Sequence, residues 1–391
     1  MKTIVVLGGG YAGLRAARQI ASAKTHQRII LINKNTYHYE ATQLHQVAAG
    51  TLEPSDITFD IKSVAPKGVE VIIDEVQRID RDQHQVLLSQ QEPVSYDYLV
   101  NALGFESETF GIEGAQENSL PLVDINTAVA ARQHLEQTLA RYQTSKDEQD
   151  LSIVVCGAGF TSIEYLGELV YRMPKLAKQY KFPLEKVKIS CIEAADSILP
   201  MFERGLADWA TNYLRKKGVE FHTSTPITSI RPGQVVSNDQ VFSGHTVIWT
   251  TGVRGSEVIS ASGYPAKRNR VVVQEDLTVE GHPEEFLIGD VSAVPDPQSG
   301  RLYPTTAQIS IAQANCAAAN IAARLAGQPS QKFTFKSVGT VCSLGPFSGV
   351  AQIEIMGQMK LKGLAVGVVK QFTNYRTVLE LADCKAMLAS R

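Results

Sequence analysis

Two short glycine-rich segments are the most informative feature of the sequence. Residues 8–13 read Gly-Gly-Gly-Tyr-Ala-Gly and stand between an apolar strand, residues 3–7, and a helical run, residues 14–23. The first glycine of this pattern permits a tight turn, the second lets the backbone approach a phosphate, and the third lets the helix pack against the strand. Because the helix N-terminus also presents free N–H groups, the segment predicts a dinucleotide pyrophosphate site. Its predicted contacts are Gly8, Gly9, Gly10, Tyr11, Ala12 and Gly13.

A second segment repeats this arrangement. Residues 157–162 read Gly-Ala-Gly-Phe-Thr-Ser, follow a strand at residues 151–156, open a helix expected to reach residue 173, and lead to a strand at residues 187–193. Ser162 replaces the third glycine, and so small a residue should only slightly loosen the packing of helix against strand. The predicted contacts here are Gly157, Gly159, Phe160 and Thr161.

Each segment begins a unit that closes in the same way. An apolar strand near residues 99–103 ends at Gly104, and another near residues 247–251 ends at Gly252. The spacing from Gly8 to Gly104 is 96 positions, and the spacing from Gly157 to Gly252 is 95. Such similar spacing predicts two copies of one nucleotide-binding fold, the second inserted into the first, with Gly104 and Gly252 beside the bound nucleotides.

The chain is expected to return to the first unit after Gly252. A strand at residues 285–290 ends in Asp290, and a polar loop then leads to a helix from about Thr306. An aspartate at the carboxyl end of a strand suits the ribityl chain and ring of a flavin. The alternative is an aspartate that only caps a helix.

Bulk composition excludes several classes of protein. The 391 residues suggest two or three domains at roughly 150 residues each. With 38 basic and 40 acidic residues, the net charge of −2 provides no basic field for nucleic acid. The five cysteines form no C-x-x-C pair and read as reduced thiols of a cytoplasmic protein, so neither a dithiol centre nor a metal site is predicted. The charge-free window at residues 302–323 is too polar to span a membrane.

The carboxyl-terminal segment differs from the rest of the chain. Residues 350–391 hold six basic and three acidic side chains, a local charge of +3. A basic amphipathic helix of this kind can lie in the headgroup region of a membrane, although such a stripe more often docks on the protein's own core. The apolar positions follow helical spacing at Leu361, Leu364, Ala365, Val368, Val369 and Phe372.

With these features in place, the chain resembles the short Gram-positive type II NADH dehydrogenases (NADH:quinone oxidoreductases) of the two-dinucleotide-domain flavoprotein superfamily. The resemblance covers nearly the whole chain. Its specific segments are residues 31–35, 37–40, 107–114, 158–161, 252–255 and 339–345. It implies an α/β fold of two Rossmann-like domains: residues 1–111 and 253–325 would bind FAD, residues 112–252 would bind NADH, and residues 326–391 would associate with a membrane.

The resemblance also implies roles for individual residues. On the NADH side, Glu193 would hold the adenosine ribose and repel the 2′-phosphate of NADPH, the alternative being an ordinary surface glutamate. Ala307, in the first turn of its helix, would help to stabilise negative charge on the reduced flavin. Glu164 and Lys370 would lie near the flavin and the quinone, with Glu164 as a proton relay or polar gate. The FAD contacts beyond the glycines would be Asn33, Lys34, Val76 and Asp290.

One motif departs from the family pattern. The quinone signature A-Q-x-A-x-Q is matched at Gln308, but Ser310 replaces the second alanine and Ala312 replaces the second glutamine. A slip of one residue to Gln313 would turn the amide by about 100° around the helix. Recognition of the quinone head group is therefore the part of the pattern that this sequence supports least.

The implied activity is hydride transfer from NADH to FAD, followed by two-electron reduction of a membrane quinone, of menaquinone type, without proton pumping. The implied protein is a homodimer bound peripherally to the cytoplasmic side of the cell membrane. Two alternatives remain: a sulfide:quinone oxidoreductase, which would use cysteines such as Cys156 or Cys342, and a non-catalytic flavoprotein that responds to NADH. The well-formed second nucleotide unit and Glu193 argue against sulfide oxidation.

Overall fold

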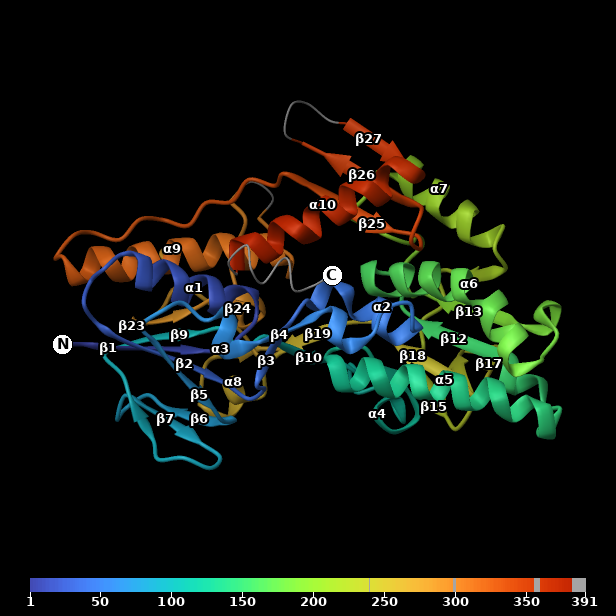
Figure 1. The fold of residues 1–391 in the computed structure, drawn as a ribbon, viewed down its shortest axis with the longest axis horizontal. Helices are drawn as coiled ribbons and strands as arrows, with labels where there is room; N and C mark the ends of the chain where they lie inside the picture. The colour runs from blue at the N-terminus through green and yellow to red at the C-terminus, as the bar shows by residue number, and fades with distance from the viewer. Residues whose placement is uncertain (239, 298–299, 355–358, 382–391) are drawn as a thin grey trace.

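The strand predicted at residues 3–7 lies near the centre of a six-stranded sheet. The computed structural model describes residues 1–238, 240–297, 300–354 and 359–381 (Figure 1). The order across this first sheet is β22 (Thr278–Val279), β23 (His282–Leu287), β9 (Tyr98–Asn101), β1 (Thr3–Leu7), β2 (Arg28–Asn33) and β5 (Val69–Ile73). Strand β1 pairs in parallel with β2 and β9, and β9 pairs in parallel with β23.

Helices α1 (Tyr11–Ser22) and α9 (Ala307–Leu325) lie side by side on one face of this sheet (Figure 1). Helix α1 begins three residues earlier than predicted, so the glycine turn is shorter. The strand predicted at residues 285–290 ends at Leu287, and Asp290 lies in the following short helix η5 (Gly289–Val291). Aspartate 290 is therefore just beyond the carboxyl end of its strand.

A second sheet repeats the first. Its strands, in order, are β11 (Leu120–Pro121), β18 (Thr246–Trp249), β12 (Ser152–Cys156), β13 (Lys188–Ile192) and β14 (Val219–His222). Strand β12 pairs in parallel with β13 and β18, and β13 pairs in parallel with β14. The order β18-β12-β13-β14 matches β9-β1-β2-β5, which confirms the predicted duplication.

Helices cover the second sheet as well. Helix α6 (Phe160–Tyr180) follows the second glycine turn and runs past Pro174, which makes it longer than predicted. It packs against α5 (Ile125–Ser145) and α2 (Leu44–Ala49), while α7 (Arg204–Arg215) lies beside its other flank (Figure 1).

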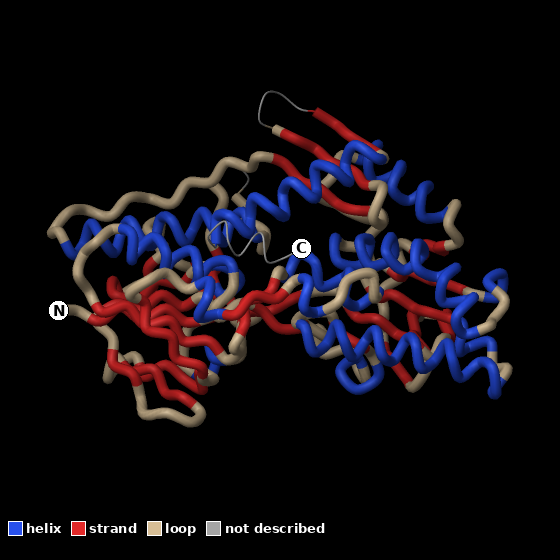
Figure 2. Tube along the Cα trace, in the orientation of Figure 1, coloured by secondary structure: helices blue, strands red, loops and turns tan. Residues whose placement is uncertain are grey.

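The two lobes are joined by a short antiparallel ribbon. Strand β10 (Phe105–Ser107) leaves the first sheet and pairs with β19 (Val253–Gly255), which returns from the second. The Trp249 indole N–H donates to the carbonyl of Glu108 at 2.9 Å, so the outgoing chain is fastened to the inserted unit. Figure 2 shows this ribbon between the two groups of strands.

The carboxyl-terminal segment crosses both lobes above their sheets (Figure 1). Strands β25 (Gly339–Ser343), β26 (Gly349–Ile353) and β27 (Met359–Lys362) form an antiparallel sheet, and α10 (Leu364–Leu381) packs against β25, β26 and α1. The predicted helical stripe was wrong at its start: Leu361 lies in β27, because Gly363 turns the chain with φ +81° before the helix begins.

The rest of the stripe points away from the protein. Leu364, Val368 and Phe372 are 70–74% exposed, whereas Val366 is fully buried. The alternative in which this apolar face docks on the protein's own core therefore does not hold for these three residues. Within the described ranges, no helix has both the length and the apolar composition needed to cross a bilayer.

Candidate functional site

The turn between β1 and α1 has the shape expected of a pyrophosphate cradle. Gly8 has φ +91°, and a Cβ there would collide with the carbonyl of Ala102. A Cβ on Gly13 would collide with the carbonyl of Gly8. Beside Gly10 the space is open, and this residue starts α1 without a side-chain cap. The free N–H groups of the helix are thus available to an anion, which is what FAD requires here.

Other residues predicted to bind FAD lie around this turn. The Asn33 side chain, at the end of β2, accepts the Gly9 N–H at 2.8 Å. Lys34 is exposed in the next position, and Val76 begins β6 (Val76–Asp80) just beyond the end of β5. Gly104 follows β9 with open space beside it. Because β1, β2, β5 and β9 run in parallel, all of these positions lie at one edge of the sheet, where nucleotides bind.

Asp290 lies at the same edge of the sheet, just after strand β23. Burial raises the pKa of its carboxyl to about 6, although the nearby Arg270 guanidinium opposes the shift. A buried carboxylate of this kind gains from hydroxyl donors such as those of a ribityl chain. Ala307 is the first residue of α9, whose N-terminus is capped by the Thr306 side chain. These features fit FAD.

The second turn has the same construction. Gly157 has φ +99°, and Gly159 starts α6 without a side-chain cap and with open space beside it. The Glu193 carboxylate accepts the Ala158 N–H at 2.7 Å and the Ala195 N–H at 2.8 Å. Glu193 therefore takes the place that Asn33 takes in the first unit, with a negative charge in addition. Thr161 is exposed in the first turn of α6.

Phe160, also predicted to contact the nucleotide, packs with its ring centroid 5.6 Å from that of Phe202. Ser162 is accommodated as expected, because its hydroxyl lies 2.6 Å from the hydroxyl of Thr250. A Cβ on Gly157 would be 3.0 Å from the Thr250 carbonyl, a looser contact than that of Gly8. The second turn is thus slightly wider than the first at this point.

The two units differ at the glycine that closes each one. A Cβ on Gly252 would lie 2.7 Å from the ring of Phe110, whereas the equivalent space beside Gly104 is open. Phe110 is half-exposed, has φ +54°, and lies with the Arg268 guanidinium 5.4 Å from its ring centroid. Sequence reasoning used residues 107–114 only as a family marker and missed Phe110 as a neighbour of the NADH unit.

Glu164 and Lys370 form a buried ion pair, with Nζ 2.7 Å from Oε1. The same carboxylate oxygen accepts hydrogen bonds from the backbone N–H and the hydroxyl of Ser343, at 2.9 and 3.1 Å. Burial disfavours the charged form of Glu164, but the Lys370 ammonium outweighs it and lowers the pKa of the carboxyl. Burial likewise opposes the charge of Lys370, yet Glu164 raises its pKa. Lys370 is therefore a largely buried partner of Glu164 and not a solvated surface lysine.

Two further ionisable residues adjoin this pair. The His45 imidazole lies 3.6 Å from the other Glu164 oxygen, and burial lowers its pKa to about 4. Glu168 follows Glu164 by one helical turn and is 1% exposed. Neither residue was predicted. The only signal for Glu168 was its i, i+4 spacing from Glu164 on a helix.

Gln308 is not part of this cluster. Its amide donates to the Gly339 carbonyl at 3.0 Å, at the start of β25, whereas Ser343 at the other end of β25 contacts Glu164. Four residue steps along a strand separate the two contacts by about 13 Å. Gln313 is buried and accepts the Gly289 N–H at 2.6 Å, so it fixes the turn before Asp290 and is not displaced toward Gln308.

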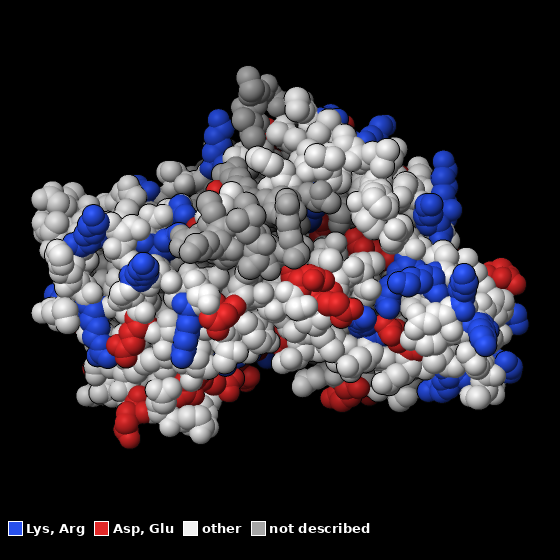
Figure 3. All heavy atoms as spheres, viewed as in Figure 1, with Lys and Arg blue, Asp and Glu red and all other residues white. Residues whose placement is uncertain are grey.

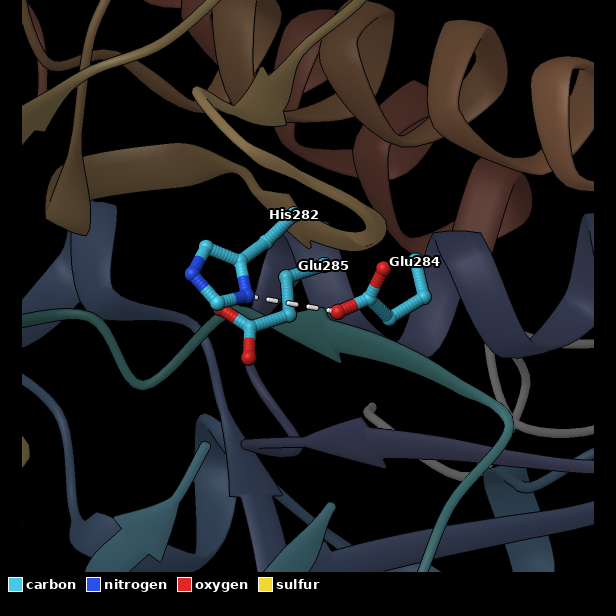
Figure 4. A group of neighbouring side chains, drawn as sticks. All are labelled: His282, Glu284 and Glu285. Atoms are coloured by element: carbon cyan, nitrogen blue, oxygen red, sulfur yellow. Dashed lines mark ion pairs between the residues drawn. The ribbon is translucent and has the colours of Figure 1, made fainter. Parts of the chain in front are cut away.

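Figure 4 shows one group of potential metal ligands, His282, Glu284 and Glu285. The fully buried Glu285 already accepts hydrogen bonds from Arg81, Tyr96 and Tyr264, at 2.9–3.0 Å. Glu285 is thus already held by three hydrogen bonds within the protein. Cysteines 156, 191, 316 and 342 are free and buried, while Cys384 lies outside the described residues.

Comparison with known proteins gives consistent matches. Residues 2–316 match the pyridine nucleotide-disulphide oxidoreductase family. A type II NADH:quinone oxidoreductase of Staphylococcus saprophyticus is 41% identical over 389 residues, which cover 97% of this chain and 96% of the relative. The structure of NDH2 from Plasmodium falciparum in complex with NADH has a TM-score of 0.89 at 18% identity, covering 100% of this chain and 96% of that one.

The same fold also occurs in an enzyme of different specificity. A sulfide:quinone oxidoreductase from Aquifex aeolicus superposes with a TM-score of 0.81 at 20% identity, covering 97% of this chain and 91% of that one. Both structural matches fall below 25% identity, so they show the fold alone. The 41% identity of the staphylococcal relative, which extends over nearly the whole of both chains, is what separates the two families.

Proposed function

We propose which residues serve the NADH step and which serve the quinone step, given that this chain belongs to the type II NADH:quinone oxidoreductases of the pyridine nucleotide-disulphide oxidoreductase family. The enzyme oxidises NADH and reduces a quinone without pumping protons. Its cofactor FAD, when bound, accepts a hydride equivalent and passes two electrons onward. The protein must therefore hold two dinucleotides end to end and provide a separate place for the quinone.

The proposed NADH side consists of the second glycine turn and Glu193. The uncapped N-terminus of α6 would hold the pyrophosphate, and Glu193 would accept hydrogen bonds from the ribose hydroxyls. Gly252 and the overlying Phe110 border the route from this turn toward the first unit. Phe110 must move aside if the nicotinamide is to lie against Gly252.

One observation supports the proposed quinone site: Glu164 and Lys370 form an ion pair buried between α6, β25 and α10. Desolvating two charges is expensive, and such pairs are often retained for a functional reason. Here the pair sits under the segment whose apolar face is exposed, so a hydrophobic quinone entering from that face would meet ionisable groups that can supply a proton. Gln308 would bind a carbonyl at the other end of β25.

The proposed membrane contact is the exposed stripe of Leu364, Val368 and Phe372 on α10. On the face drawn in Figure 3, basic and acidic side chains both occur over the two lobes. The local +3 charge is also partly used within the protein, because Lys370 pairs with Glu164 and Lys360 with Glu203. Attachment to the cytoplasmic leaflet would thus depend mainly on apolar burial.

Menaquinone as the acceptor and a homodimeric state are further predictions of the family resemblance. The first is tested with a panel of benzoquinones and naphthoquinones, and the second by light scattering of the purified enzyme.

The assignment of residues to the NADH step and the quinone step is tested by measuring the two half-reactions separately. Gln308→Ala removes one hydrogen bond to a carbonyl that becomes more negative on reduction, a loss of about 1–3 kcal/mol, or roughly 5–150-fold in the quinone step. Flavin reduction by NADH should keep its rate, while reoxidation by a soluble quinone slows. If Gln308→Ala slows the NADH step and spares reoxidation, the quinone has been placed at the wrong end of the flavin.

A further inference from the structure

Glu168 is a buried carboxyl with an unpaired oxygen. It lies on α6 one turn after Glu164, its side chain is 1% exposed, and its Oε2 has no hydrogen-bond partner among the described residues. Buried polar atoms are nearly always hydrogen-bonded, so such an oxygen requires an explanation. A protonated carboxyl tolerates this position far better than a charged one, since only the charged form carries the full cost of desolvation.

Glu168 belongs to the same electrostatic cluster as Glu164. The two carboxyls are helical neighbours, with Cβ atoms about 5–6 Å apart, a separation that one water molecule can bridge. Lys370 interacts with both of them. The titratable or polar groups that face Glu168 or its partner are Glu164 on α6, His45 and Gln46 on α2, Thr51 in the following loop, Cys342 and Ser343 on β25, and Lys370 on α10.

The pKa values of the two carboxyls are shifted in opposite directions. Burial raises the pKa of Glu168 above its ordinary value, and the charge of Glu164 raises it further. The pKa of Glu164 is lowered by Lys370. His45 is neutral at physiological pH, because burial lowers its pKa to about 4. Glu168 therefore holds a proton more readily than Glu164 does, and the buried, unpartnered oxygen of Glu168 favours the same protonated form.

Two partly exposed polar residues adjoin Glu168. The side chains of Gln46 and Thr51 lie against its carboxyl, and both residues are partly exposed. The Thr51 hydroxyl donates to the Gln46 carbonyl at 3.3 Å, so the two polar residues are held together at the end of α2. Glu168 thus adjoins two partly exposed polar residues as well as the buried Glu164.

The overall reaction needs one proton from the protein. NADH, one proton and a quinone give NAD⁺ and a quinol: NADH supplies two electrons and one proton as hydride, and the second proton comes from water. We propose that Glu168 supplies this second proton. It protonates Glu164, which delivers the proton to a quinone oxygen, and Glu168 is reprotonated from water past Gln46 and Thr51. This inference rests on the proposed reduction of quinone beside Glu164.

The direct test is Glu168→Gln. Glutamine matches a protonated glutamate in size and charge, so the variant removes the proton and little else. Flavin reduction by NADH should be unchanged, while reoxidation by a soluble quinone should slow at least about tenfold at pH 7, within the range ascribed to general acids. The pH profile of reoxidation should also lose one step. Glu185→Gln, which alters an exposed carboxylate on the same lobe, is the matched control.

A second variant covers the case in which Glu168→Gln does not fold. Thr51→Val leaves both carboxyls in place and removes a polar contact of Glu168. The first reoxidation of prereduced enzyme should then run at the normal rate, while repeated turnover should slow because Glu168 is reloaded slowly. Wild-type rates and pH profiles in both variants would overturn the inference. If wild-type enzyme itself is not reoxidised by any quinone, the proposed function fails instead.

Discussion

The buried pair of Glu164 and Lys370 makes a prediction that stability measurements can check without any substrate. In Lys370→Met, Glu164 would lose the ammonium 2.7 Å from its Oε1 while remaining 5% exposed. Removing one partner of a buried pair costs about 3–5 kcal/mol, because the other charge is left uncompensated. Lys370 is 17% exposed and Ser343 still donates two hydrogen bonds to Glu164, so we expect the lower end, about 3 kcal/mol at pH 8.

The loss of folding stability caused by Lys370→Met should depend on pH with a definite sign. In the wild type, the lowered pKa of Glu164 stabilises the fold above the unfolded pKa, and this contribution is lost as pH falls through the folded pKa. In Lys370→Met, the ammonium no longer opposes burial, so the pKa of Glu164 should rise even though Ser343 still donates its two hydrogen bonds, and the carboxyl should take up a proton more readily on acidification. The stability difference between wild type and variant should therefore narrow between pH 8 and pH 5.

The assay is urea unfolding at both pH values, followed by circular dichroism. The double variant Lys370→Met, Glu164→Gln should recover most of the lost stability, because no buried charge remains, whereas the control Lys362→Met changes only an exposed lysine. A stability loss that is the same at pH 5 and pH 8, and that the second substitution fails to restore, would refute the uncompensated-charge reasoning.

Three other predictions concern the nucleotides and the membrane. Glu193→Gln should raise kcat/KM for NADPH relative to NADH by about tenfold, because it removes the charge that repels the 2′-phosphate, and an unchanged ratio would contradict this role. FAD affinity should rise as pH increases through about 6, since a ribityl hydroxyl favours ionised Asp290; equilibrium binding should show this dependence, and Asp290→Asn should abolish it. Leu364→Glu with Phe372→Glu should weaken vesicle binding at least about tenfold, while the exposed Val272→Glu should not; equal sedimentation of all three proteins would exclude α10 as the anchor.

Local sequence patterns were sufficient for the two nucleotide turns. A glycine turn needs only a strand, a few residues without Cβ atoms and a helix, all within about 25 residues, so its geometry is encoded where it occurs. The equivalence of Asn33 and Glu193 was also predictable, because Asn33 ends the strand after the first turn and Glu193 directly follows the strand after the second. In the structure, each accepts the N–H of the middle residue of its own glycine turn, Gly9 or Ala158.

Long-range contacts account for what the sequence did not reveal. Glu164 meets Ser343 and Lys370 across 179 and 206 positions, and no spacing rule connects such residues. Helical periodicity alone could not decide which way Gln313 points, and the contact with Gly289 settles this. At the carboxyl terminus, the apolar spacing continued through Gly363, where the chain changes from strand to helix. The helical spacing of apolar residues does not reveal a turn of that kind.

Strand β25 explains why the quinone-side residues belong to neither nucleotide unit alone. Its first residue, Gly339, accepts a hydrogen bond from Gln308 on α9, and its last residue, Ser343, donates two to Glu164 on α6. Because α9 packs on the first sheet and α6 on the second, one strand fixes the distance between groups carried by different lobes. Any relative movement of the lobes would have to break one of these contacts or shift β25 with its partner β26. The carboxyl-terminal segment is therefore the element that holds the proposed quinone site in register with both nucleotide sites.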